Sequence, residues 1–309
     1  MKISCIIPAR DKTDLLLIDL LRSIDIQNYP KELVEVLVVT EGDSEQAKAI
    51  GVRQATGDIL CMLCADNLIL DQDLFEGIRE LFTTYPGLVG VYSKHYHYRK
   101  KDNSLNRYFA LIGANDPIPF YLGKADRLPH WNQNSTELMT FLEFQDSIPS
   151  LGDNGFFLRA KWFKTSNLDH YYPMDCCEDL RKAGLNTYIR VNNDYLWHRT
   201  AENLISFMRK RYRYARDLYC DRQDRRWKML DSKEDYWRLC FFVFATLTFV
   251  NPFLISLRGY CRIKDWAWFW HWPVALGTII TYGLLACRNL LRHRSLFQHS
   301  ADLKVSKPA

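Results

Sequence analysis

The chain has 309 residues, of which 48% are hydrophobic and 25% are charged, and its formal net charge is +5. Between Arg199 and Lys228 there are 10 Lys or Arg against 4 Asp or Glu, so the basic excess is local and we expect no nucleic-acid partner. The length suits one α/β domain of about 200 residues followed by a segment of different character.

Apolar runs alternate with helical patterns over the first third of the chain. Residues 3–7 predict a buried strand that ends at Pro8, and the leucine spacing over 17–24 predicts a helix. A second strand is expected over 34–39, and an alanine-rich helix over 46–54. Because residues 3–7 form the first strand, they are too few to serve as the apolar region of a signal peptide.

A third apolar run, from Gly57 to Asn67, ends in the polar pair Asp66-Asn67. The order β-α-β-α-β requires right-handed crossovers and predicts a mostly parallel sheet. Three strand ends, at residues 9–11, 40–43 and 66–67, then converge at one edge, where such sheets bind ligands. A carboxylate there can hold a divalent cation, although an Asp that caps the next helix gives the same pattern.

The segment from Tyr92 to Gln145 is polar and aromatic, with weak periodicity. Aromatic faces stack on sugars, and Asn or Asp pair with hydroxyl groups, so this insert is expected to shape an acceptor side. An ordinary surface subdomain with buried tyrosines is the alternative. The residues chosen for the acceptor side are Asn115, Asp116 and Lys124.

Six short motifs together carry a resemblance to a known family. They are Ile-Ile-Pro-Ala-Arg-Asp (6–11), Val-Val-Thr-Glu-Gly (38–42), Ala-Thr-Gly-Asp (55–58), Ala-Asp-Asn (65–67), Ser-Leu-Gly-Asp-Asn-Gly (150–155) and Cys-Glu-Asp-Leu (177–180). In this order the series resembles the family 2 glycosyltransferases, over roughly residues 3–216. The resemblance implies a GT-A fold, which is α/β, Rossmann-like and mostly parallel, and the transfer of a sugar from a nucleotide-diphosphate donor with inversion.

The resemblance also implies roles for the matching residues. Asp66 is expected to hold Mn²⁺ or Mg²⁺ beneath the diphosphate, while Asp179, beside Glu178, takes a proton from the acceptor hydroxyl. Asn154 and Gly155 belong to the acceptor-side loop. The nucleotide-binding residues are Pro8, Ala9, Arg10, Asp11, Glu41, Lys48 and Asp66.

Two positions depart from the family pattern, because Cys64 and Thr40 stand where Asp is frequent. Asp66 is therefore the only acidic residue of its motif, and its loss is expected to remove most of the activity. Cys61 and Cys64 have the spacing of a redox or zinc pair, but residues three apart on a strand point to opposite faces. The nine cysteines are expected to be reduced thiols of a cytosolic domain.

Residues 204–216 predict an amphipathic helix with apolar and basic stripes. Its basic stripe faces either anionic lipid or a donor or lipid phosphate. The family motif Gln-x-x-Arg-Trp is matched literally at 223–227 and loosely at 210–214, and the distance from the catalytic motif favours 210–214. The residues predicted to meet phosphate or acceptor, besides Asn154 and Gly155, are His198, Arg209, Lys210, Arg213 and Tyr214.

The stretches Leu239 to Leu257 and Trp266 to Cys287 contain 19 and 22 residues without a formal charge. Each is close to the ~20 residues that cross a bilayer, and tryptophans near their ends resemble interfacial anchors. We expect a hairpin of two crossings with both termini in the cytoplasm. Helices that lie in the interface or re-enter the membrane are the alternative, because Pro252 and Pro273 interrupt the two stretches.

The predicted organisation is a GT-A domain (1–200), a basic helical segment at the membrane surface (201–235), two transmembrane or interfacial helices (236–291) and a basic cytoplasmic tail (292–309). We predict a glycosyltransferase at the cytoplasmic membrane face, with a lipid-linked acceptor such as polyprenyl phosphate. The alternatives are a processive polysaccharide synthase, a sugar nucleotidyltransferase and a non-catalytic membrane scaffold.

Overall fold

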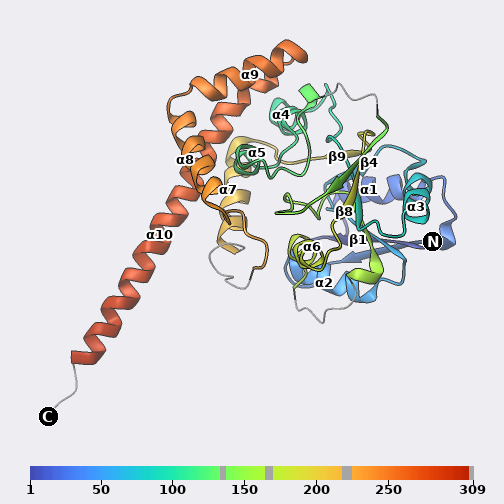
Figure 1. The fold of residues 1–309 in the computed structure, drawn as a ribbon, viewed down its shortest axis with the longest axis horizontal. Coiled ribbons are helices and arrows are strands. Elements are labelled where there is room, and N and C mark those ends of the chain that lie inside the picture. Colours follow the sequence, from blue (N-terminus) through green and yellow to red (C-terminus); the bar gives the residue numbers. More distant parts are fainter. Residues whose placement is uncertain (133–136, 164–169, 218–224, 306–309) are drawn as a thin grey trace.

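The computed structural model describes residues 1–132, 137–163, 170–217 and 225–305, the last sixteen of these by their backbone alone. A sheet domain and a group of C-terminal helices lie side by side, and the last helix extends away from both (Figure 1). The main sheet has seven strands in the order β2-β1-β3-β7-β5-β8-β6. Their bounds are Ile3–Pro8 (β1), Val34–Val39 (β2), Ile59–Met62 (β3), Gly90–Ser93 (β5), Met139–Glu143 (β6), Phe156–Arg159 (β7) and Thr187–Val191 (β8).

The sheet is mixed but mostly parallel, as the sequence predicts. Strand β1 pairs in parallel with both β2 and β3, and β5 pairs in parallel with β8. Strand β7 runs antiparallel to β3 and β5, and β6 runs antiparallel to β8, so five of the seven strands share one direction. The helices between the first strands are α1 (Leu15–Asp25) and α2 (Ser44–Gln54), which confirms the predicted β-α-β-α-β order.

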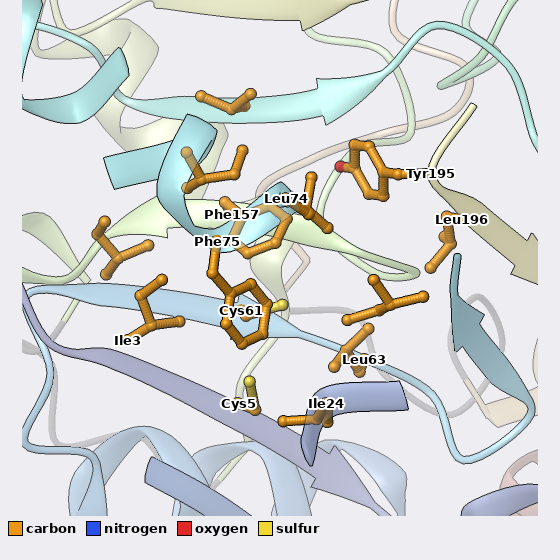
Figure 2. Packing of buried hydrophobic residues seen from close by; sticks show 14 of the residues in the cluster. Ile3, Cys5, Ile24, Cys61, Leu63, Leu74, Phe75, Phe157, Tyr195 and Leu196 are labelled. Carbon is orange, nitrogen blue, oxygen red and sulfur yellow. The ribbon is translucent and has the colours of Figure 1, made fainter. Parts of the chain in front are cut away.

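Alternate residues of β1 enter two different cores, as the period of a strand requires. Cys5 packs with Cys61, Phe75 and Phe157 on the face covered by α1 and α3 (Leu74–Thr84), which is the cluster drawn in Figure 2. Ile6 packs on the opposite face, against residues of α2 and α6 (Pro173–Lys182). Both faces of β1 and β3 are therefore buried, which fixes the positions of their ends.

The third predicted strand is shorter than its apolar run. Strand β3 ends at Met62, and a turn then leads into β4 (Asn67–Ile69), which pairs antiparallel with β9 (Leu196–His198). The turn closes because the Asn67 N–H donates to the Cys64 carbonyl at 3.0 Å, while the Asn67 side-chain oxygen accepts from the Cys64 N–H at 2.8 Å. Asp66 thus lies in this turn and not at the end of the strand itself.

The remaining helices form a second layer beside the sheet domain. The predicted insert contains α4 (Ser104–Ile112) and α5 (Pro117–Leu122), followed later by α7 (Leu204–Ala215). The C-terminal helices are α8 (Lys233–Leu247), α9 (Val250–Arg262), the 3-10 turn η5 (Trp266–Trp270) and α10 (His271–Val305). Buried side chains of α4, α7, η5 and α10 share one core, and α5 packs with α8 and α10 in another.

Over the residues that it describes, the structure does not support the predicted hairpin of two membrane crossings. The first stretch is broken into α8 and α9, whose axes meet at 85°. Phe249 has a φ of +64° at the break, and Pro252 falls in the first turn of α9, where its missing N–H needs no helical partner. Pro273 likewise lies in the first turn of α10. Among the described residues no single helix has the length and hydropathy of a membrane span, whereas the bent α8–α9 pair has both when taken together.

Candidate functional site

The carboxyl ends of β1 and β2 lie side by side at one edge of the sheet. Pro8 is opposite Val39 in the register, and the Ala9 N–H donates to the Val39 carbonyl at 2.9 Å. The residues that follow on each strand are open to solvent, and they include the predicted nucleotide contacts Arg10, Asp11 and Glu41. The predicted convergence of these two loops is therefore present, although their role toward a nucleotide remains a prediction.

Asp66 is the centre of the site, and two basic side chains from distant segments meet it. His198 Nδ1 lies 3.3 Å from Oδ1, and Lys210 Nζ lies 3.5 Å from Oδ2. The pairing of β4 with β9 brings His198 next to Asp66, while α7 carries Lys210. Burial opposes ionisation of Asp66, but His198 and Lys210 outweigh it and hold the pKa of this carboxyl well below its usual range.

Asn67 orients the groups around Asp66. Since its side-chain oxygen accepts from Cys64, its amide nitrogen is the atom that faces both His198 Nδ1 at 2.9 Å and the Asn154 oxygen at 3.2 Å. The Asn67 amide can therefore donate to His198 Nδ1, the ring nitrogen that also faces Asp66. Oδ1 of Asp66 is buried and accepts no hydrogen bond from the described residues, even though 26% of the side chain is exposed.

A buried carboxylate oxygen next to an imidazole lone pair is the kind of donor set that a divalent cation takes. Asp66 Oδ1 and His198 Nδ1 form such a pair once the Asn67 amide, 2.9 Å from Nδ1, releases the imidazole lone pair to the cation. The described residues contain no group of three or more His, Cys, Asp or Glu that could enclose an ion by themselves. A cation held by this pair needs further oxygen ligands, such as those of a diphosphate or of water. The pair suits a metal that is shared with a substrate.

The loop of residues 150–155 is packed against this cluster in an unusual backbone conformation. Asn154 and Gly155 have φ values of +55° and +69°, and Asn and Gly are the residues that adopt this region most readily. The buried Arg127 donates to the Asn154 carbonyl at 2.6 Å, and the Tyr195 hydroxyl donates to the Gly155 carbonyl at 2.6 Å. The loop predicted for the acceptor side is thus held rigidly beside Asn67.

Lys48, predicted to contact the nucleotide, is buried in an ion-pair cluster. Its ammonium lies 2.8 Å from Asp153 and 3.3 Å from Glu45. Burial works against the charged lysine, but Asp153 and Glu45 prevail and raise its pKa. Asp153 was not among the predicted site residues, and its position between Gly152 and Asn154 in the matched loop was the available signal. The pair joins α2 to the loop, so a direct nucleotide contact by Lys48 remains a prediction.

The predicted catalytic pair, Glu178 and Asp179, lies on α6. Asp179 is 48% exposed and forms a 2.6 Å ion pair with Arg226. Glu178 is bound by Arg181 at 2.7 Å and by Lys182 at 3.5 Å. No contact between described residues joins Asp179 to Asp66, so its role as general base stays a prediction.

One turn earlier on α6, Asp175 is almost completely buried. It accepts from Arg225 Nε at 2.9 Å and from the Trp227 N–H at 3.0 Å. The two candidate basic motifs therefore have different acidic partners, because Lys210 of the first lies beside Asp66. Gln223 lies outside the described residues. The sequence reasoning missed Asp175, although the helix start at Pro173 placed it in the first turn.

The three residues predicted for the acceptor side contact neighbouring elements. Asn115 donates to the Tyr96 hydroxyl at 2.9 Å and accepts from Thr200 at 2.9 Å. Asp116 accepts from the Tyr282 hydroxyl of α10 at 2.8 Å. Lys124 binds Asp235 of α8 at 2.8 Å. The last two attach the C-terminal helices to the two ends of α5, and an acceptor role for the three residues remains a prediction.

The basic face of α7 divides into two groups. Lys210 and the partly buried Arg211 point inward, and Arg211 lies 3.9 Å from Asp116. Arg209 and Arg213 are exposed. Tyr214 packs beneath the Arg211 guanidinium at 5.1 Å, and burial raises the pKa of its hydroxyl. The inward residues belong to the site, whereas the outward ones are free to meet phosphate.

No protein-family model matches the chain, and no curated protein matches it either. Among solved structures, it is similar to a mannosyltransferase from Pyrobaculum calidifontis in complex with GDP-Man and Mn²⁺, at 15% identity over 99% of this chain and 81% of that one, with a TM-score of 0.45. It is also similar to S. aureus TarS 1-349 in complex with UDP-GlcNAc, at 15% identity over 91% and 81% of the two chains, with a TM-score of 0.40. Scores this low carry no argument about function, which must come from the site.

Proposed function

We propose that the chain is a glycosyltransferase that takes a sugar from a nucleotide-diphosphate donor and requires a divalent cation, Mn²⁺ or Mg²⁺. The observation that carries the proposal is Asp66, which lies in the turn after β3, the strand that pairs with β1. Its buried Oδ1 accepts no hydrogen bond from the described residues and lies 3.3 Å from His198 Nδ1. The resemblance of the sequence to family 2, whose members invert the anomeric centre, agrees with this arrangement.

The chain's own residues supply most of what such a reaction needs. Asp66 and His198 would hold the cation, which when bound offsets the charge that develops on the departing nucleoside diphosphate. Lys210, 3.5 Å from Asp66, adds a fixed positive charge on the same side. The exposed loops after β1 and β2 are open to the base and ribose, while the rigid 150–155 loop limits where the acceptor can sit.

Two carboxylates are candidates for the general base. Asp179 is the one that the family resemblance indicates. Asp153 is the one that the geometry favours, because it is 29% exposed in the loop beside Asn67 and its Oδ1 lies 2.8 Å from the Lys48 ammonium. The variants Asp179→Asn and Asp153→Asn distinguish the two candidates. The variant that loses turnover but still binds the donor identifies the base, and the other should keep its turnover within about tenfold of wild type.

For the acceptor, we propose a lipid-linked molecule such as a polyprenyl phosphate, used at the cytoplasmic face of a membrane. The exposed Arg209 and Arg213 on α7, one turn apart on the helix that carries Lys210, support a phosphate-bearing acceptor. Incubation of the purified protein with labelled nucleotide sugars and a membrane lipid extract tests this, since label should pass into the organic phase.

The deciding experiment is calorimetry of UDP and GDP binding, with and without Mn²⁺. We expect binding that depends on Mn²⁺ and that Asp66→Asn abolishes, while Asp19→Asn, at a 58% exposed carboxylate on α1, leaves it unchanged. Nucleotide binding that Asp66→Asn does not alter would contradict the proposal. A non-catalytic scaffold predicts no cation-dependent binding, and a sugar nucleotidyltransferase predicts formation of nucleotide sugar from a sugar phosphate and a nucleoside triphosphate.

A further inference from the structure

We propose that α8 and α9 form an elbow that lies in the plane of an anionic membrane surface and holds the protein there without crossing the bilayer. This inference depends on the C-terminal helices alone, so it stands or falls separately from the glycosyltransferase activity.

Helix α8 has two faces of opposite character. Its outward face carries large apolar side chains at helical spacing, with exposed fractions between 52% and 76%. They are Tyr236, Trp237, Phe241, Phe244 and Leu247. An exposed row of this size on a folded chain marks a surface that another phase or molecule covers.

The inward face of α8 is attached to α5 and the residues that follow it by specific contacts. Phe242 stacks near Tyr121, with ring centroids 4.7 Å apart. Arg238 donates to the Leu122 carbonyl at 2.7 Å, and Asp235 binds Lys124. Because one face is held in this way, α8 lies along the protein and its apolar row points away from it.

Helix α9 repeats the arrangement after the bend. Phe253, Leu254 and Leu257 are exposed by 40% to 54%, whereas Ser256 and Gly259 face inward against Trp268. The exposed Phe249 and Val250 sit at the bend itself, so the apolar surface passes from one helix to the next. At 15 and 13 residues the helices are about 22 and 20 Å long, shorter than the ~30 Å hydrocarbon core, which favours in-plane binding.

The charges around the elbow select the kind of membrane. Residues 228–264 contain six Lys or Arg and three Asp or Glu, and all six basic residues are exposed, while Asp235 is buried in its pair with Lys124. Basic residues beside an exposed aromatic and aliphatic face are the composition of helices that bind anionic lipid surfaces. Trp237 and Trp266, exposed by 76% and 71%, are suited to the headgroup region.

Flotation of the full-length protein with lipid vesicles tests the proposal. We expect binding to phosphatidylcholine vesicles that contain phosphatidylglycerol, and weaker binding to phosphatidylcholine alone. The combined change Trp237→Ser, Phe244→Ser and Leu254→Ser should lower the partition coefficient at least about a hundredfold on both vesicles. Reversal of Arg258, Arg262 and Lys264 to Glu should remove mainly the preference for phosphatidylglycerol, by about fivefold or more per charge.

A matched control uses apolar residues that are equally exposed elsewhere. Leu15, Leu138 and Ile205 are exposed by 76%, 88% and 62%, and their combined change to Ser should leave flotation unchanged. Thermal melting of all variants tests whether the fold is kept, which we expect because every altered residue is exposed. Alkaline carbonate should release the bound protein, whereas it does not release a protein that crosses the bilayer.

Several results would overturn the proposal. The wild-type protein could fail to float with the vesicles, the apolar triple variant could float as well as wild type, or alkaline carbonate could leave the protein on the vesicles. Sedimentation velocity without lipid tests a second copy of the chain as the occupant of the apolar face. A wild-type dimer that the apolar triple variant converts to monomer would favour that occupant and overturn the lipid one.

Discussion

Asp235 of α8 joins the C-terminal helices to Lys124, which follows α5. Its Oδ2 accepts from Lys124 at 2.8 Å and from the backbone N–H groups of Asp231 and Ser232 at 3.0 Å each, and its side chain is only 7% exposed. Burial opposes its ionisation, but these donors outweigh burial and lower its pKa to about 2. We expect Asp235→Asn to lower the free energy of unfolding substantially at neutral pH.

The size of the effect follows from the pKa. A fall from 3.8 to about 2 corresponds to roughly 2–3 kcal/mol at about 1.4 kcal/mol per pKa unit, and Asn loses this because it carries no charge for Lys124. Since the folded pKa is the lower one, the contribution is complete above the unfolded value of 3.8 and is lost as the pH falls toward 2. The difference between Asp235→Asn and wild type should therefore shrink to roughly half by about pH 3.

Urea unfolding followed by tryptophan fluorescence measures this difference at several pH values. The matched control is Glu234→Gln, because Glu234 is 70% exposed and pairs with Arg238 on the same helix, an interaction that contributes less than about 1 kcal/mol. If Asp235→Asn is no more destabilising than Glu234→Gln at pH 7, or if its cost is the same at pH 7 and pH 3, the reasoning is wrong.

Three further predictions concern other parts of the fold. Burial opposes ionisation of Glu35, but hydrogen bonds from neighbouring side chains and backbone lower its pKa to about 2. Glu35→Gln should therefore cost about 3–4 kcal/mol in urea unfolding at pH 7, and progressively less as the pH falls from 4.5 toward 2. A Cβ on Gly259 would stand 2.2 Å from the buried indole of Trp268, so Gly259→Ala should lower the melting temperature and reduce the free energy of unfolding by about 1–3 kcal/mol. The control Gly77→Ala, which has open space around its Cβ, should raise the melting temperature slightly. Lys48→Met leaves the carboxylate of Asp153 without its 2.8 Å partner and should cost about 3 kcal/mol, and an unchanged urea midpoint would show that this buried pair does not stabilise the fold.

The first half of the sheet was predictable because its signals are local. Apolar runs of strand length and leucines at helical spacing lie close together in the sequence, and the predicted strand over 34–39 coincides with β2. The convergence of the β1 and β2 ends follows from the crossover rule alone. Asp66 was found because it ends the third apolar run, even though β3 itself stops at Met62.

Other features depend on contacts between distant segments and could not be read from a pattern. The charge of Lys210 is evident in the sequence, but only the packing of α7 brings it within 3.5 Å of a residue 144 positions away. The sequence does not show that the Lys48 ammonium lies 2.8 Å from Asp153. The bend between α8 and α9 could not be predicted for a similar reason, since an uncharged stretch shows neither the φ of Phe249 nor the face that packs on the protein.

The position of β7 also bears on the order in which the chain acquires its structure. This strand, Phe156–Arg159, lies between β3 and β5 and joins the β2-β1-β3 group to the β5-β8-β6 group. On a ribosome, the first group can assemble from near neighbours as soon as residue 62 emerges. Closure of the sheet has to wait for some hundred further residues, so we expect the slow step of folding to be the entry of β7.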